Sequence, residues 1–192
     1  MTSLGIDEAR AALERGEVLL MDTDSLPGLH ALATVEGAAG RLARLKGHAP
    51  DRPYLLLAES VDAAFRIGQA ATQEQAVRLS AIWPAALTAL LRPSVECRPE
   101  WTGEAGSVGV RVPASQRLRE FLAALDGPLL STSANKAGCA PAEDLASAAR
   151  LFPSLPLVRL GTGAAAGPST IVDCAANPAN VVREGVVPWA PE

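Results

Sequence analysis

Residues 131–138 bring hydroxyl, amide and ammonium side chains together in one short segment, Ser-Thr-Ser-Ala-Asn-Lys-Ala-Gly. The apolar residues 128–130 precede it, a pattern typical of a strand that ends in a polar loop. Ser, Thr and Asn supply neutral hydrogen-bonding groups, and small side chains let a phosphate or carboxylate approach the backbone closely. The segment is therefore a candidate ligand-binding loop. An ordinary turn is the alternative, because Ser, Asn and Gly also dominate turns.

A second polar segment, residues 22–29, follows the short apolar run at residues 18–21. It reads Asp-Thr-Asp-Ser-Leu-Pro-Gly-Leu and places hydroxyl and carboxylate groups directly after a predicted strand. Such a loop can present several side chains to one ligand, but a plain turn built by Asp and Ser has the same composition. Both interpretations stay open for this segment taken alone.

Three basic side chains lie within seven residues, at Lys46, His48 and Arg52, between a predicted helix at 38–46 and a predicted strand at 54–57. Lysine acts as a mobile point charge and arginine as a planar fork, so this group could clamp a polyphosphate. The alternative is a lysine that the helix dipole favours near a C-terminus, together with an arginine that stays in solvent.

Arg111 lies in the middle of an alternating segment, residues 107–113, that predicts a strand. With a period of two residues, Ser107, Gly109 and Arg111 share one face, and the three valines between them and after them share the other. An arginine in an apolar strand is costly unless it meets an anion. Arg111 is therefore a stronger ligand candidate than a loop arginine, with a structural salt bridge as the alternative.

The composition predicts one folded domain over residues 1–192, because 48% of the residues are hydrophobic and 20% are charged. The formal net charge of −4 gives no general attraction to nucleic acid or to an anionic membrane. Cys97, Cys139 and Cys174 have no paired spacing, and with His30 and His48 they form neither a zinc motif nor a disulfide framework. The sequence shows no export signal and no apolar run of membrane-spanning length, so we expect a cytoplasmic protein.

Periodicity and capping residues predict helices that alternate with short strands along the chain. Ser60 and Thr72 are expected to begin two of the helices as N-caps, the second with Gln75 in a capping box. The predicted helices cover residues 6–16, 38–46, 60–68, 72–83, 118–125 and 145–152. The predicted strands cover residues 18–21, 54–57, 87–91, 107–113, 128–130, 155–160, 169–173 and 180–187. The last two strands are expected to form a hairpin that turns near Glu184 and Gly185.

Seven short motifs, taken in order, resemble the YrdC/TsaC family of threonylcarbamoyl-AMP synthases. They are D-T-D-S-L-P-G-L, K-G-H-A-P-D-R-P, W-P-A-A-L-T, S-V-G-V-R-V-P, S-T-S-A-N-K-A-G, P-S-T-I-V-D and V-V-R-E-G. They run from about residue 18 to residue 187 in the order and approximate spacing of that family. The chain is similar to the single-domain form, without the C-terminal extension of the longer branch.

The resemblance implies an α/β fold: an open, twisted, mixed sheet flanked by helices, with a concave ligand cavity. It also implies an enzyme, a nucleotidyltransferase that converts L-threonine, bicarbonate and ATP to threonylcarbamoyl-AMP and pyrophosphate. The product serves to modify the tRNA adenosine next to the anticodon, and tRNA takes part only indirectly, through threonylcarbamoyl-transfer proteins. No membrane is involved, and Mg²⁺ is expected on the ATP, held mainly by phosphate oxygens.

Residue roles follow from the same resemblance. Catalysis by positioning and charge neutralisation is expected to depend on Lys46 and Arg111. The residues similar to the threonine-binding set are Ser25, Arg111, Ser131 and Ser169. The residues similar to the ATP-binding set are Lys46, Ser107, Ser133 and Arg183, with His48, Arg52 and Asn135 as further candidates.

The chain departs from the family pattern at several of these positions. Asp22 stands in place of a proline, Ser25 in place of a threonine and Pro27 in place of an aromatic residue. His48 stands where the family has an arginine, and Arg52 is four residues further on. Two alternatives therefore stay open: a diverged paralogue that binds a nucleotide or adenylates another carbamate, and a non-catalytic RNA-binding module.

Overall fold

The computed structural model of the protein describes residues 3–47, 54–103, 105–161 and 167–189. Within these residues the strands form a ten-stranded sheet in the order β10-β9-β5-β6-β3-β7-β2-β1-β8, with β4 paired to β5 beside this path. The strands are β1 Leu19–Met21, β2 Gly28–Leu32, β3 Leu55–Leu57, β4 Gly68–Gln69, β5 Leu87–Pro93, β6 Val108–Arg111, β7 Leu129–Ser133, β8 Leu157–Val158, β9 Thr170–Asp173 and β10 Asn180–Arg183.

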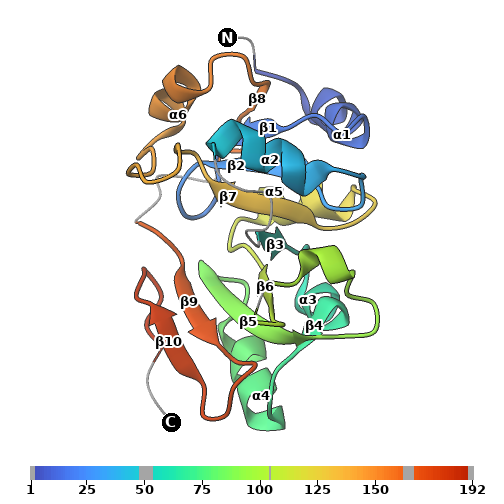
Figure 1. Ribbon diagram of the computed structural model, residues 1–192, viewed down its shortest axis with the longest axis vertical. Coiled ribbons are helices and arrows are strands. Elements are labelled where there is room, and N and C mark those ends of the chain that lie inside the picture. Colours follow the sequence, from blue (N-terminus) through green and yellow to red (C-terminus); the bar gives the residue numbers. More distant parts are fainter. Residues whose placement is uncertain (1–2, 48–53, 104, 162–166, 190–192) are drawn as a thin grey trace.

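The sheet is mixed, as the family resemblance implied. The pairs β1–β8, β3–β6 and β5–β9 are parallel, and the other pairs are antiparallel. Figure 1 shows β1, β2, β7 and β8 at one end of the molecule and β5, β9 and β10 at the other, with β3 and β6 joining the two parts. Strands β3 and β6 therefore make the two parts one continuous sheet, through the pairs β3–β7 and β5–β6.

Helices flank this sheet, and their caps agree with the sequence. The helices are α1 Ile6–Glu14, α2 Ala38–Lys46, α3 Val61–Ile67, α4 Gln73–Ile82, α5 Gln116–Ala123 and α6 Leu145–Leu151, with a 3-10 turn, η1, at Pro99–Trp101. The Ser60 hydroxyl accepts a hydrogen bond from the Ala63 amide, and the Thr72 hydroxyl accepts one from the Gln75 amide. Both predicted N-caps are confirmed. The capping box expected with Gln75 is not formed, because Gln75 Nε2 donates to the Ala176 carbonyl and its Oε1 has no hydrogen-bond partner among the described residues.

Two hydrophobic cores lie on opposite faces of the sheet, because successive strand residues alternate between faces. Leu20, Leu56 and Leu130 belong to the core that includes residues of α2, α3, α4 and α6. Their neighbours Leu57 and Leu129 belong to the core that includes residues of α1 and α5. The second face is also the one on which the polar strand residues described below lie.

The structure differs from the prediction in one strand end, one missed strand and the position of one turn, besides small shifts at the ends of other elements. The strand at 128–130 continues as β7 through Ser133, because it pairs with β2 and, as far as Ser131, also with β3. Strand β2 was missed, since Gly28–Leu32 carries no β-branched residue and its pairing partners are distant in sequence or beyond a loop. The hairpin of the last strands turns between β9 and β10, not near Glu184, and the Val186 amide instead bonds the Pro168 carbonyl.

No helix in the described part of the chain is both long enough and apolar enough to cross a membrane. The cytoplasmic location stays a prediction.

His30 lies in the middle of β2 and is completely buried. Burial, and secondarily the positive charge of Arg111, lowers its pKa from 6.5 to about 3. Neither ring nitrogen has a hydrogen-bond partner among the described residues. The folded protein therefore keeps this imidazole neutral.

A neutral, buried His30 makes the free energy of unfolding depend on pH. The unfolded chain takes up a proton near the ordinary pKa of 6.5, whereas the folded chain does so only near 3. The free energy of unfolding is therefore unaffected by the protonation of His30 above pH 6.5. Below that pH it decreases by up to about 1.4 kcal/mol per pH unit, because the unfolded chain binds a proton that the folded chain does not. Denaturant unfolding of the wild type and of His30→Leu between pH 7 and 4 measures the difference. Parallel stability curves would contradict the prediction.

Candidate active site

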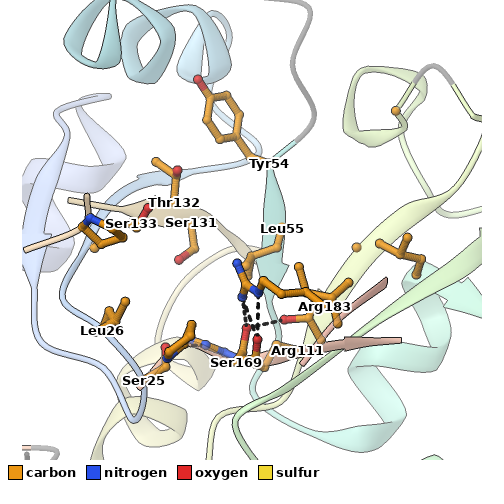
Figure 2. A pocket seen from close by; sticks show the side chains of 18 of the residues that line it. Ser25, Leu26, Tyr54, Leu55, Arg111, Ser131, Thr132, Ser133, Ser169 and Arg183 are labelled. Atoms are coloured by element: carbon orange, nitrogen blue, oxygen red, sulfur yellow. Dashed lines mark hydrogen bonds between the residues drawn. The ribbon is translucent and has the colours of Figure 1, made fainter. Parts of the chain in front are cut away.

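A cavity of about 890 Å³ opens on one face of the sheet. Its wall is built by residues of β2, β3, β5, β6, β7, β9 and β10 and by the loop between β1 and β2 (Figure 2). Seven of the residues predicted as ligands line it: Ser25, Ser107, Arg111, Ser131, Ser133, Ser169 and Arg183. These positions are far apart in the sequence, so the sheet brings most of the predicted site together.

Strand alternation places these side chains. Gly109 and Arg111 face the cavity from β6, while Val108 and Val110 are fully buried in the core on the other face. The sequence-based assignment of faces is therefore confirmed.

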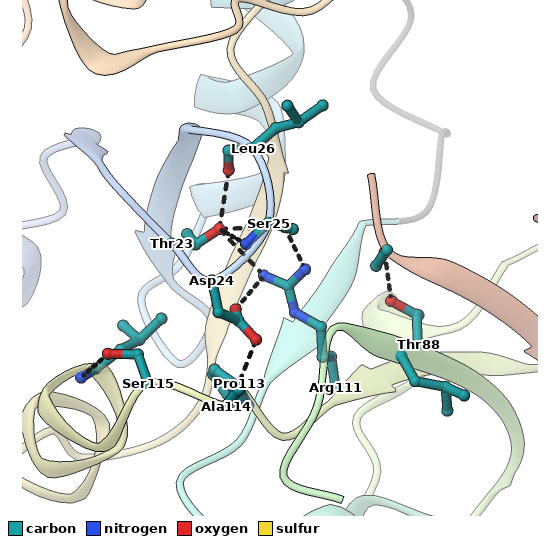
Figure 3. A network of polar contacts seen from close by, with 12 residues as sticks. Thr23, Asp24, Ser25, Leu26, Thr88, Arg111, Pro113, Ala114 and Ser115 are labelled. Carbon is teal, nitrogen blue, oxygen red and sulfur yellow. Dashed lines mark hydrogen bonds and ion pairs between the residues drawn. The ribbon is translucent and has the colours of Figure 1, made fainter. Parts of the chain in front are cut away.

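Arg111 is 2% exposed and is held by the β1–β2 loop. Its Nη1 donates a hydrogen bond of 2.6 Å to Ser25 Oγ, and its Nη2 lies 3.5 Å from both Asp24 Oδ1 and Thr23 Oγ1 (Figure 3). Burial lowers the pKa of Arg111, Asp24 opposes that shift, and Arg183 adds to it. The salt bridge that the sequence left open is thus present, and both terminal nitrogens are engaged within the protein.

Asp24 extends this network across the loop. Its Oδ2 accepts a hydrogen bond of 2.7 Å from the Ala114 amide, which follows β6. The side chains of Asp24 and Arg111 are 6% and 3% exposed. The loop between β1 and β2 is therefore fixed against β6 by a buried ion pair.

Arg183 and Ser169 form a second polar cluster at the cavity. Arg183 donates from Nε and Nη2 to the Ser169 carbonyl, at 3.1 and 2.6 Å, and from Nη2 to Ser169 Oγ at 3.1 Å. Ser169 Oγ also lies 3.1 Å from Thr88 Oγ1, on β5. Partial burial lowers the pKa of Arg183. Arg183, similar to the ATP set, and Ser169, similar to the threonine set, are therefore in direct contact.

Lys46 ends α2 beside the loop at 131–138. Its Nζ donates to the Ser133 carbonyl at 2.9 Å and to Asn135 Oδ1 at 2.6 Å. Asn135 Oδ1 also accepts from Ser133 Oγ at 2.7 Å, and Asn135 Nδ2 donates to the Cys139 carbonyl at 2.7 Å. Asn135 thus shapes this turn and holds the lysine beside the cavity-lining Ser133. His48 and Arg52 lie outside the described residues.

The local charge differs from that of the whole chain. Arg111 and Arg183 lie at one end of the cavity with Asp24 close to Arg111, so these three groups sum to +1, whereas the chain carries −4. The described residues contain no group of three or more His, Cys, Asp or Glu side chains that could hold a metal ion. This end of the cavity is suited to an anionic ligand group.

Sequence reasoning assigned no role to Asp24, Thr23 or Thr88. Asp24 and Thr23 lie inside the motif at residues 22–29, one position and two positions before Ser25, the candidate ligand in that motif. Thr88 is the direct neighbour of Arg111 in the register of β5 and β6, a pairing that sequence alone does not give. For Asp24 and Thr23 the available signal was their place beside Ser25 in a polar motif, and for Thr88 the sequence held no such signal.

Comparisons with known proteins place the sequence among the members of one family. The model of the Sua5/YciO/YrdC family, described as "Telomere recombination", matches residues 11–185. A threonylcarbamoyl-AMP synthase of Chromohalobacter salexigens is 35% identical over 169 residues, which cover 88% of this chain and 91% of the relative. The threonylcarbamoyl-AMP synthase of Pseudomonas entomophila is 33% identical over 188 residues, which cover 96% and 100%.

Solved structures share the fold. E. coli YciO has a TM-score of 0.78 at 25% identity, covering 94% of this chain and 89% of its own. P. abyssi Sua5, crystallised with L-threonine, has a TM-score of 0.84 at 24% identity. This chain spans 54% of the Sua5 chain, and at this identity the likeness shows the fold alone.

The predicted α/β fold, an open mixed sheet flanked by helices with a cavity on one face, is thus confirmed by the structure and by its neighbours. The match over residues 11–185 and the identities of 33–35% over most of both chains support the resemblance drawn from the seven motifs. The chain belongs to the Sua5/YciO/YrdC family.

Proposed function

We propose that the protein is an L-threonylcarbamoyl-AMP synthase. The threonine amine and bicarbonate form a carbamate with loss of water, and a carbamate oxygen then attacks the α-phosphorus of ATP and releases pyrophosphate. Relatives that are 33–35% identical over most of both chains carry this name. The observation that carries the proposal is one cavity lined by all four residues similar to the threonine set and by Ser107, Ser133 and Arg183 of the ATP set. Lys46 and Asn135 do not line it but are hydrogen-bonded to Ser133.

The size and charge of the cavity fit these substrates. Its volume of about 890 Å³ lies within the usual range for small-molecule sites, roughly 300–1,000 Å³. We assign the threonine carboxylate to the end that holds Arg111 and Arg183, since buried cations favour an anionic partner. Because Ser25 and Asp24 engage its terminal nitrogens, Arg111 acts mainly by fixing the loop and by its charge, not as a free bidentate fork.

The phosphates belong, in this proposal, beside Lys46 and the loop at 131–138. Ser133 lines the cavity wall with its hydroxyl proton directed at Asn135 Oδ1, and the Lys46 ammonium lies 2.9 Å from the Ser133 carbonyl oxygen. Mg²⁺ bound to phosphate oxygens and water would neutralise charge on the polyphosphate. The protein then holds the carbamate oxygen in line with the α-phosphorus, so that positioning supplies most of the acceleration.

The use of the product is a further part of the proposal. Threonylcarbamoyl-AMP carries an activated acyl group that a separate transfer protein can pass to tRNA adenosine. On this view tRNA is a partner only through the transfer proteins. The net charge of −4 supports this indirect role, because it provides no general attraction to RNA.

The proposed reaction predicts pyrophosphate release that needs both L-threonine and bicarbonate. Purified protein with Mg-ATP should release pyrophosphate and form threonylcarbamoyl-AMP only when both are present, as measured by a coupled pyrophosphate assay and mass spectrometry. L-Serine and carbamoyl phosphate are the comparison substrates. ATP turnover that is independent of threonine, or that is supported by carbamoyl phosphate instead, would reject the synthase and favour the diverged paralogue.

Lys46→Met should weaken the use of ATP more than that of L-threonine. We expect kcat/KM for ATP to fall at least about tenfold, close to 1.4 kcal/mol, because a cation beside the phosphates is lost. Lys136→Met is the matched control, since this loop lysine bonds the Leu45 carbonyl and lies over the Phe152 ring. Equal losses in the two variants would show that Lys46 only maintains the loop.

Arg111→Met should destabilise the fold as well as abolish activity. It leaves the Asp24 carboxylate buried without its cation, at a cost of about 3–5 kcal/mol. The double variant Arg111→Met/Asp24→Asn should recover most of this stability in denaturant unfolding while remaining inactive. Arg92→Met, which alters an exposed arginine bonded to the Ala175 carbonyl, is the control. A double variant as unstable as the single one would show that the ion pair is not the cause.

A further inference from the structure

His30 lies directly beneath the wall of the cavity without lining it. It shares a sheet face with Gly28, and it is the direct cross-strand neighbour of Ser131. Gly28 and Ser131 both line the cavity. A Cβ atom placed on Gly28 would lie 2.7 Å from His30 Nε2, so the imidazole occupies the space that a side chain at position 28 would need. The ring is therefore separated from the cavity by a glycine and a serine.

A packing role does not account for a histidine at this position. The ring is completely buried, and neither nitrogen is hydrogen-bonded to a described residue. A buried polar group without a partner costs about 1–3 kcal/mol. An aliphatic side chain would fill the space without that cost. The histidine therefore lowers the stability of the fold, and such a cost points to a role in the adjoining site.

Other buried groups without full hydrogen bonding lie at the same end of the cavity. Asp24 Oδ1 and Arg111 Nε have no hydrogen-bond partner among the described residues, and the charge of Arg111 acts on His30. Among these side chains only Arg111 lines the cavity, and Asp24 is its ion-pair partner, whereas Arg41, Gln75 and Trp189 neither line the cavity nor pair with Arg111 in the described contacts. Unused hydrogen-bonding capacity is therefore concentrated where the proposed function places the amino acid.

Ser131 is the residue through which His30 can reach a ligand. Directly opposed residues of an antiparallel pair have Cβ atoms about 4.5–5.5 Å apart on the same face. Ser131 is 6% exposed, and its side chain points into the cavity in Figure 2. A small rotation about the Ser131 Cα–Cβ bond moves Oγ toward His30 on the same sheet face while Oγ stays at the cavity wall. The two side chains are thus placed to act as a pair.

We propose that His30 is a positioning residue of the amino-acid subsite, and this inference rests on the proposed function. When substrate binds, His30 accepts a hydrogen bond from the Ser131 hydroxyl. With its proton directed at the imidazole, Ser131 Oγ presents only lone pairs to the cavity. Those lone pairs accept an N–H of the threonine amine. The nitrogen lone pair of the amine is then directed away from the wall, toward the bicarbonate carbon with which it forms the carbamate.

A role as general base fits His30 less well. Its pKa of about 3 leaves the ring neutral at physiological pH, because burial and the Arg111 charge both oppose protonation. Taking a proton from the amine would place a second buried cation near Arg111 without a counterion. A neutral imidazole can still accept a hydrogen bond through its unprotonated nitrogen. His30 therefore orients the serine and does not store the proton.

The test compares His30→Leu, which removes the acceptor, with His30→Gln, which keeps one. His30→Leu should fold with an unchanged or higher Tm at pH 7.5. Its KM for L-threonine should rise about tenfold, whereas kcat and the KM for ATP change less than about twofold. His30→Gln should return the KM for L-threonine to within about threefold of the wild type. An unchanged KM in His30→Leu, or an equal rise in the KM for ATP, overturns the proposal.

A double-mutant cycle tests whether His30 acts on the substrate through Ser131. If His30 acts through the serine, His30→Leu should add nothing in a Ser131→Ala background. Additive effects would mean that His30 does not work through Ser131 and would overturn that assignment.

Direct binding of L-threonine, measured by calorimetry on the same variants, separates this proposal from the proposed function. A wild type that binds threonine without releasing pyrophosphate would reject the synthase, and the loss of affinity in His30→Leu would still support His30. A wild type that does not bind threonine overturns both.

Discussion

The burial of one guanidinium group organises the candidate site. Arg111 is 2% exposed, and a charge so far from water must be balanced by an opposite charge and by hydrogen bonds. Asp24 and Ser25 meet this requirement from a loop that lies 86 residues away in sequence. Asp24 also accepts a hydrogen bond from the Ala114 amide. One ion pair therefore fixes the β1–β2 loop against β6, and with it the position of Ser25 at the cavity wall.

This constraint also sets the electrostatics of the cavity. The Asp24 carboxylate neutralises only one of two neighbouring cations, and Arg183 is held in place by the Ser169 carbonyl, a neutral acceptor. The lowered pKa values of both arginines record that the charges are partly removed from water. An anionic group that binds here interacts with the two guanidinium groups in place of the water that burial removes from them. A chain with a net charge of −4 can thus select anions by local geometry, whereas its overall field would repel them.

The sequence predicted those features of the structure that depend on interactions between residues close together in the chain. The alternation around Arg111 gave the correct faces of β6, and Ser60 and Thr72 gave two helix starts, because strand period and capping are short-range. Pairing between distant strands decided the rest. Ser131 and its neighbours have turn-like composition, yet β2 and β3 hold them in a strand. The partners of Arg111 were likewise hidden, since Thr88 and Asp24 meet it only through the register of the sheet and the course of a loop.

Strand β7 continues through Ser133, where the sequence predicted a loop, and this makes the wall of the site more rigid than a loop would be. Ser131 and Ser133 stand on a paired strand, so their backbone positions are fixed before any ligand arrives, and Ser131 is paired on both sides. Side chains on such a strand lose little freedom on binding, which favours precise placement of the ligand. The proposed reaction, which joins an amine, a bicarbonate and a polyphosphate, would depend mainly on holding its partners in line. A rigid wall of serine hydroxyl groups with two adjacent guanidinium groups supplies this placement. A side chain that acts as a general acid or base is not needed to place the substrates.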